Sequence, residues 1–146
     1  MKPAPLALLL VCGCGFPYQT PPATPEELTA IDELTRAISD HADRTGDLLD
    51  RGVADELRKA PIAIFDDDPC VGGYLSYGTT RLGRVYLYAG LFGPLRRRET
   101  LRVLYHEGVH LTQGWWRLLT DSAGAEDEAL QRQDDFLKRY REAGKR

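Results

Sequence analysis

The string His106-Glu107-Gly108-Val109-His110 constrains this chain more than any other feature, since it holds two of the three histidines among 146 residues. Apolar or small side chains recur around it at spacings of three and four. This pattern predicts a helix over residues 94–113, with Pro94 in its first turn and Gly114 as its stop. On such a helix both imidazoles project from one face, where they can hold a single metal ion.

A catalytic zinc site needs a third protein ligand and an open position for water. Glu126 is the first candidate, because the pattern of a second predicted helix, residues 122–141, places it on the inward stripe, where a carboxylate requires a cation. Glu128 falls on the side expected to meet water and is the second candidate. Asp121 and His41 are further alternatives, although His41 lies in a polar segment that predicts a solvated histidine at a helix end.

These motifs resemble those of the gluzincin metallopeptidases, in which an HExxH helix precedes a second helix that carries a glutamate in an E-x-x-A-type motif. The two elements here are residues 106–110 and the string Glu126-Asp127-Glu128-Ala129. With Gln113 included, the first string also resembles the HExxHxxQ of small bacterial zincin-like domains. The resemblance covers roughly residues 74–140, and its second motif is much less specific than its first.

The resemblance implies the hydrolysis of a peptide bond in a peptide or protein substrate. It assigns His106, His110 and Glu126 as ligands of Zn²⁺. Glu107 becomes the general base, which takes a proton from the water that the zinc activates and passes it to the leaving amine.

This chain departs from the gluzincin pattern in two respects. Leu130 stands where many gluzincins carry an aspartate that orients a histidine ligand, so Gln113 or a backbone carbonyl would have to orient the imidazole instead. The downstream His or Tyr that stabilises the transition state in that family has no identifiable counterpart. The alternative function is therefore that of a non-catalytic metal-binding lipoprotein of the cell envelope.

The amino terminus predicts the compartment. The apolar run of residues 6–11 is too short to span a membrane but is typical of a signal peptide. The string Val11-Cys12-Gly13-Cys14 resembles a bacterial lipoprotein cleavage site, with residues 1–13 as the signal peptide and Cys14 as the lipidated residue. Residues 14–25 are rich in proline and are expected to form an extended tether. We therefore expect a lipid anchor that holds the protein to a membrane of the cell envelope, with secretion as the alternative.

The remaining pattern predicts a minimal zincin-like domain of α+β class over residues 26–146, with a small antiparallel sheet packed on helices that include the HExxH helix. The expected order is two helices that begin at Pro25 and Asp47, a strand at 62–65, a hairpin of strands 74–79 and 84–89, and the two helices described above. Residues 84–89 are a candidate edge strand to which an extended peptide adds, or an ordinary sheet strand. The net charge of −3 offers no general electrostatic attraction for nucleic acid.

Overall fold

The computed structural model describes residues 23–65, 70–71, 74–75, 77–93 and 95–144. The predicted signal peptide, the predicted lipidation site Cys14 and most of the predicted tether lie outside the described residues. Within the described ranges, no helix combines the length and the apolar character that crossing a membrane requires.

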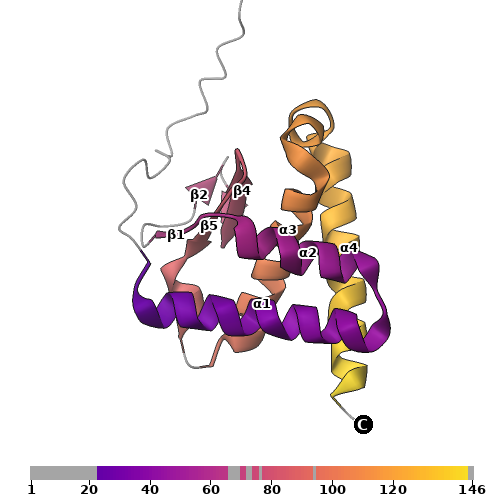
Figure 1. The fold of residues 1–146 in the computed structure, drawn as a ribbon. Helices are drawn as coiled ribbons and strands as arrows, with labels where there is room; N and C mark the ends of the chain where they lie inside the picture. The colour runs from indigo at the N-terminus through magenta and orange to yellow at the C-terminus, as the bar shows by residue number, and fades with distance from the viewer. Residues whose placement is uncertain (1–22, 66–69, 72–73, 76, 94, 145–146) are drawn as a thin grey trace, which may run out of the picture.

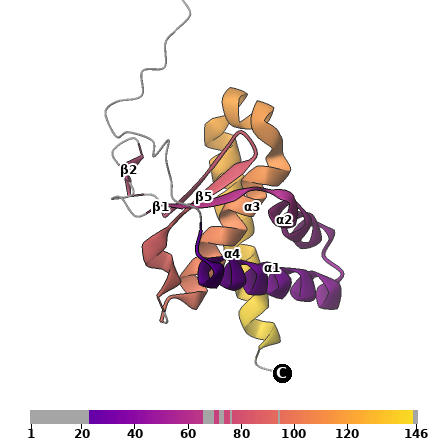
Figure 2. The same cartoon turned by 60° about the vertical axis from the view of Figure 1, so that its left-hand side comes forward.

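Long helices and a small sheet make up the described chain. In chain order the elements are α1 (Pro25–Thr45), α2 (Leu48–Lys59), β1 (Ile62–Phe65), β2 (Cys70–Val71), β3 (Tyr74–Leu75), β4 (Gly78–Arg81), β5 (Arg84–Tyr88), the 3₁₀ turn η1 (Ala89–Phe92), α3 (Arg97–Thr120) and α4 (Ser122–Ala143). Helix α3 contacts α1, α2, α4 and strand β4, so it lies at the centre. Figures 1 and 2 show α1 and α2 side by side across α3, with the sheet next to them. The class is α+β, as predicted.

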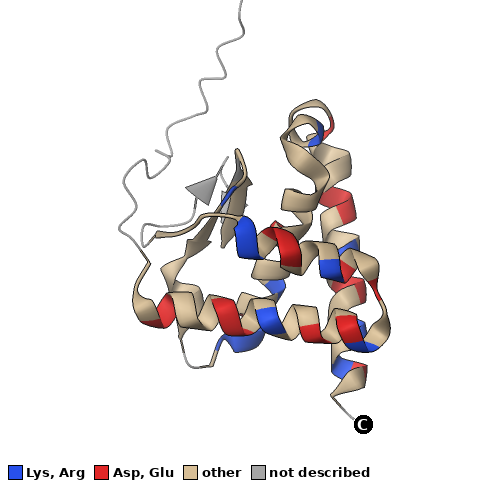
Figure 3. Cartoon of the chain, viewed as in Figure 1, with Lys and Arg blue, Asp and Glu red and all other residues tan. Residues whose placement is uncertain are grey.

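The first two helices begin and end at the residues that the sequence indicates. The Thr24 side chain accepts a hydrogen bond from the backbone N–H of Glu27, and the Glu27 carboxylate accepts one from the backbone N–H of Thr24. Gly46 ends α1 in the left-handed region, at φ 71°, and Asp47 caps α2. Figure 3 shows acidic and basic residues interspersed along both helices.

The three-stranded sheet has the order β1-β5-β4, and its topology corrects one prediction and decides between two alternatives. Strand β5 pairs antiparallel with β4 but parallel with β1, so the sheet is mixed rather than antiparallel. The strand predicted at 84–89 is consequently the central strand and not an edge, and Val85 and Leu87 are completely buried. Strands β1 and β4 are the two edge strands of this sheet.

The hairpin of β4 and β5 forms as predicted, but its first strand is shorter. Leu82 and Gly83 connect the strands, both at positive φ (49° and 75°), as a two-residue hairpin turn requires. The strand predicted over 74–79 is divided: β4 begins at Gly78, and β3 pairs instead with β2 in a separate two-stranded sheet.

Helix α3 carries the HExxH string and is longer than predicted. It begins at Arg97, three residues after the predicted start, and Pro94 lies outside the described residues. Gly114 leaves the helical conformation, at φ 75° and ψ 152°, as expected of the predicted stop. The chain then resumes a helical path as far as Thr120, and this added segment forms part of the wall of the cleft described below.

Close packing of α2 on α3 depends on Gly108, inside the HExxH string. A Cβ atom at this position would lie 2.6 Å from Val53 Cγ1 and 3.0 Å from Leu57 Cδ1. We therefore expect Gly108→Val to lower the free energy of unfolding by about 2 kcal/mol or more, measured by urea denaturation. Gly52→Ala, in α2, is the matched control, because a Cβ there meets no atom within 4 Å. It should raise stability by roughly 0.5–1 kcal/mol, and equal losses in both variants would contradict the packing argument.

Candidate metal centre

Three predicted ligand residues come together between α3 and α4. His106 and His110 stand one turn apart on α3, and their Nε2 atoms are 3.1 Å from each other. Glu126, in the second turn of α4, places Oε2 3.1 Å from His110 Nε2 and Oε1 3.3 Å from His106 Nε2. Each residue thus presents one metal-binding atom, and these atoms all lie within 4.8 Å of one another.

The donor set and its spacing fit a zinc ion. Around a tetrahedral zinc with bonds of about 2.0–2.1 Å, ligand atoms stand roughly 3.3–3.4 Å apart. The two imidazole Nε2 atoms are 3.1 Å apart, and each lies 3.1–3.3 Å from a different oxygen of the Glu126 carboxylate, which is close to this value. Two imidazoles and one carboxylate leave the fourth position open, which is the arrangement of catalytic rather than structural zinc sites.

Glu126 reaches this position without being buried, and this corrects the prediction of an inward carboxylate. Its side chain is 52% exposed. Ala129, Gln133 and Phe136, which share its stripe, are buried as predicted. This face of α4 therefore packs against the core along most of its length, but its first residue, Glu126, faces an open cleft. Leu130, which was also predicted to face inward, is exposed.

The electrostatics of the triad favour an ionised carboxylate. Hydrogen bonds from His106 and His110 hold the pKa of Glu126 far below its usual range. Burial opposes a charge on His110, but its bonds to Glu126 and Gln113 outweigh burial and raise the pKa of His110. A cation at this point would replace a proton as the positive partner of Glu126.

Gln113 orients His110, as one of the two predicted substitutes for the missing aspartate. Its amide nitrogen donates to the carbonyl of Ala125 at 2.9 Å, so its oxygen is left to accept from Nδ1 of His110 at 2.8 Å. With the proton on Nδ1, the lone pair of Nε2 points to the metal position. His106 has no such support: its Nδ1 is buried and lacks a hydrogen-bond partner among the described residues.

This arrangement predicts a measurable effect on metal affinity. Gln113→Ala should weaken zinc binding by about 10–100-fold, because the ring of His110 loses its fixed orientation. Gln113→Glu should retain most of the affinity, since a carboxylate also accepts from Nδ1. Competition with a chromophoric chelator measures both, and Gln131→Ala, at an exposed position of α4, is the control. Equal affinity for Gln113→Ala and the control would contradict this role.

Glu107 is buried on the side of α3 that faces β4. Its Oε2 accepts a hydrogen bond from the Thr80 hydroxyl at 2.8 Å. Burial raises the pKa of Glu107, although His106 and His110 act in the opposite direction. Gly78 permits the close approach, because a Cβ there would lie 2.9 Å from Glu107 Oε1.

An open cleft of about 590 Å³ contains both the triad and Glu107. Its walls come from three elements: β4 and the residue before it, both segments of α3, and α4. The lining residues that sequence reasoning did not identify are Tyr77, Gly78, Thr79, Thr80, Arg102, Val103, Leu118, Ser122 and Gln133. These residues belong to no recognisable sequence motif. The predicted hairpin before the HExxH helix was the one signal in the sequence for those that lie in β4.

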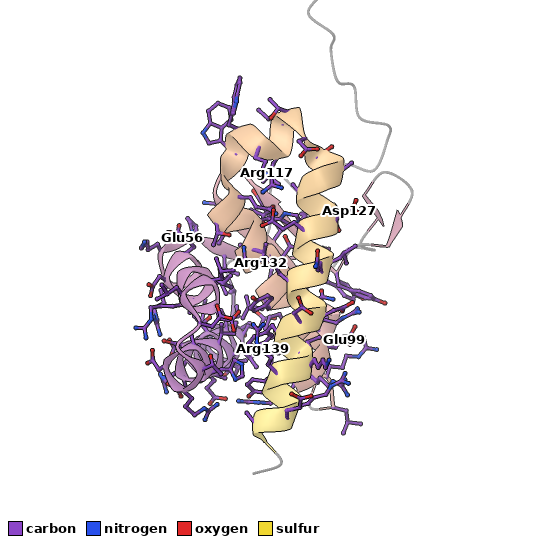
Figure 4. The ribbon with its side chains drawn as sticks, turned by 90° about the vertical axis from the view of Figure 1, so that its right-hand side faces the viewer. Glu56, Glu99, Arg117, Asp127, Arg132 and Arg139 are labelled. Atoms are coloured by element: carbon purple, nitrogen blue, oxygen red, sulfur yellow. The ribbon has the colours of Figure 1, made fainter. Side chains whose placement is uncertain are left out.

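The other two acidic candidates on or near α4 have different partners. Glu128 forms ion pairs with Arg117 and, at 3.7 Å, with Arg132. Figure 4 shows these two arginines where α3 and α4 run side by side. Asp121 caps α4 by accepting from the backbone N–H of Gly124 at 3.1 Å. Neither acidic residue lines the cleft.

His41 lies away from the triad and is buried, so the prediction of a solvated histidine was wrong. Its ring packs edge-on against Phe136, with centroids 5.4 Å apart, and its Nε2 is 4.0 Å from Asp50 Oδ2. Burial lowers the pKa of His41. The polar segment around it gave no sign that α4 would cover this face of α1.

No protein-family model, no curated protein and no solved structure matches this chain. The residues of the site and their geometry therefore carry the functional argument.

Proposed function

We propose that this protein is a zinc-dependent metallopeptidase with a minimal zincin-like domain of gluzincin type. The observation that carries the proposal is the convergence of His106, His110 and Glu126 in the cleft that also contains Glu107. A purely structural zinc site uses four protein ligands and has no need of a general base. Three ligands beside a buried carboxylate are the parts that hydrolysis needs.

The chemistry divides between the metal and the chain. Zinc held by His106, His110 and Glu126 would lower the pKa of a bound water to around 7 and would polarise a carbonyl group. Glu107 takes the proton of the attacking water and delivers it to the leaving amine. The hydrogen bond from Thr80 fixes the carboxylate in the cleft.

Strand β4 supports a peptide as the substrate. It is one of the two edge strands of its sheet, and its residues Gly78, Thr79 and Thr80 line the cleft. An extended peptide that adds to this edge would pass Glu107 with its backbone held by main-chain hydrogen bonds. We assign this proposed role to β4, because residues 84–89, the other candidate from the sequence, contain the central strand β5.

We further propose that a lipid on Cys14 holds the domain at the cell envelope, with a secreted form as the alternative. The lipoprotein-type string at residues 11–14 supports this location. Metabolic labelling with an alkynyl fatty acid, compared between the wild-type chain and Cys14→Ser, tests the anchor. Equal labelling of the two would exclude it.

One observation favours a second candidate function, that of a non-catalytic metal-binding lipoprotein. The Nδ1 atom of His106 has no partner among the described residues, and Leu130 stands where the orienting aspartate was expected. A metal site in which one histidine ligand is not held in orientation has a lower metal affinity and supports catalysis less well.

Metal analysis combined with a cleavage assay decides between the two functions. The purified protein should contain one zinc per chain, and mass spectrometry should detect cleavage of a mixed-sequence peptide library that stops after chelation and returns with zinc. A protein that holds zinc but cleaves nothing in the library would establish the second candidate. A protein that holds no zinc would exclude both.

A further inference from the structure

Arg102 is a positively charged side chain in the wall of the cleft that the proposed mechanism does not use. It stands on α3 one helical turn before His106, and its side chain is 42% exposed. Four residues of helix correspond to about 6 Å along the helix axis, and Arg102 and His106 line the same cleft.

The donors of Arg102 are only partly satisfied. One nitrogen, Nη2, contacts Glu99 Oε1 at 2.6 Å. Nε is shielded from solvent and has no hydrogen-bond partner in the described part of the chain. The pair with Glu99 is solvent-exposed and spans three residues of one helix, so it contributes little and competes weakly with a ligand. A guanidinium group with five N–H donors retains capacity for a second carboxylate.

The cleft itself offers no carboxylate to Arg102. Its acidic lining residues are Glu107 and Glu126. Glu107 accepts from Thr80, and Glu126 contacts the two imidazoles. Among the described residues that line the cleft, none therefore supplies Arg102 with a second carboxylate, and a ligand in the cleft could do so.

We infer that Arg102 forms a carboxylate-binding subsite, and that the substrates are peptides with a carboxylate close to the scissile bond. Each residue of an extended peptide covers about 3.5 Å, so a carboxylate within a few residues of the scissile carbonyl can reach Arg102 along the same cleft. The carboxylate is either the C-terminus of the peptide or an Asp or Glu side chain. This inference rests on the proposed peptidase function.

Three defined probes separate the two sources of the carboxylate. These are N-acetylated trialanine as the free acid, the same peptide as the C-terminal amide, and the amide with glutamate as its last residue. Calorimetric titration of the zinc-loaded Glu107→Gln protein measures their binding without turnover. The free acid, the glutamate amide or both should bind about tenfold or more tightly than the plain amide, because one charge-assisted interaction accounts for such a difference.

Substitution then tests whether Arg102 is responsible. Adding Arg102→Gln should remove the preference, and Arg102→Lys should retain part of it, since a lysine keeps the charge but not the planar fork. Glu99→Gln should preserve or increase it. Arg98→Gln, at an exposed position one turn earlier and outside the cleft, is the matched control.

The inference and the proposed function fail in different ways. Equal binding of all three probes, or a preference that survives Arg102→Gln, overturns the carboxylate subsite while zinc binding and library cleavage stand. A loss of kcat that is the same for acid and amide substrates in Arg102→Gln also overturns it, because Arg102 would then act on the transition state of every substrate. Absence of zinc overturns the proposed function first.

Discussion

Glu107→Gln will abolish most peptide hydrolysis and leave the zinc in place. Glutamine cannot take a proton from water, and loss of a general base costs about 10²–10⁴-fold in rate. The amide oxygen can still accept the hydrogen bond that Thr80 donates, so the side chain should keep its position and the fold should be retained. Cleavage of a reporter peptide found in the library, together with the zinc content of the same sample, measures both parts of the prediction.

Glu128→Gln is the matched control for this experiment. It makes the same chemical change on α4, but Glu128 pairs with Arg117 and Arg132 and does not line the cleft. It should therefore cleave the reporter at nearly the wild-type rate. Substantial activity in Glu107→Gln would show that another group serves as the base. A loss of zinc in that variant would show that Glu107 acts on the metal directly.

Glu126→Ala should weaken zinc binding by more than about 100-fold, a larger loss than the one expected for Gln113→Ala. Gln113 only orients a ligand, and such outer partners contribute about 10–100-fold. Glu126 by contrast supplies one of the three converging atoms and the negative charge of the triad. Zinc should also raise the Tm of the wild-type protein but hardly that of Glu126→Ala, because a ligand stabilises the state that binds it.

Asp127→Asn controls for a change of charge beside the site. Asp127 is the next residue of α4, exposed and outside the cleft lining, and Figure 4 labels it on that helix. Its zinc affinity should remain close to that of the wild type. If Glu126→Ala bound zinc as tightly as Asp127→Asn, the contacts of Glu126 with the imidazoles would be simple ion pairs and the third ligand would lie elsewhere.

Features that depend on neighbouring residues in the chain could be predicted from the sequence. The cap at Thr24, the stop at Gly46 and the turn at Leu82-Gly83 each arise from backbone preferences and hydrogen bonds within a few residues. The same holds for the positions of His106 and His110, because the 3.6-residue period of a helix places them on one face. These interactions involve only residues close together in the chain.

Features that depend on which surfaces meet could not be predicted. Strand β1 pairs parallel with β5, and nothing in either strand indicates that pairing. The helical period predicted on which face of α4 the side chain of Glu126 lies. It did not predict whether that part of the face meets the core or solvent. His41 is in a polar segment, yet α4 buries it.

The amino-acid sequence by itself, through local periodicity and capping, places His106, Glu107 and His110 on one helix. It also places Glu126 on a second helix. Only the packing of α4 on α3, and of β4 against Glu107, decided that these groups converge in an open cleft with Arg102 at its wall. The physical reason is that burial and ligand geometry are properties of contacts between distant segments, which no pattern within one segment contains.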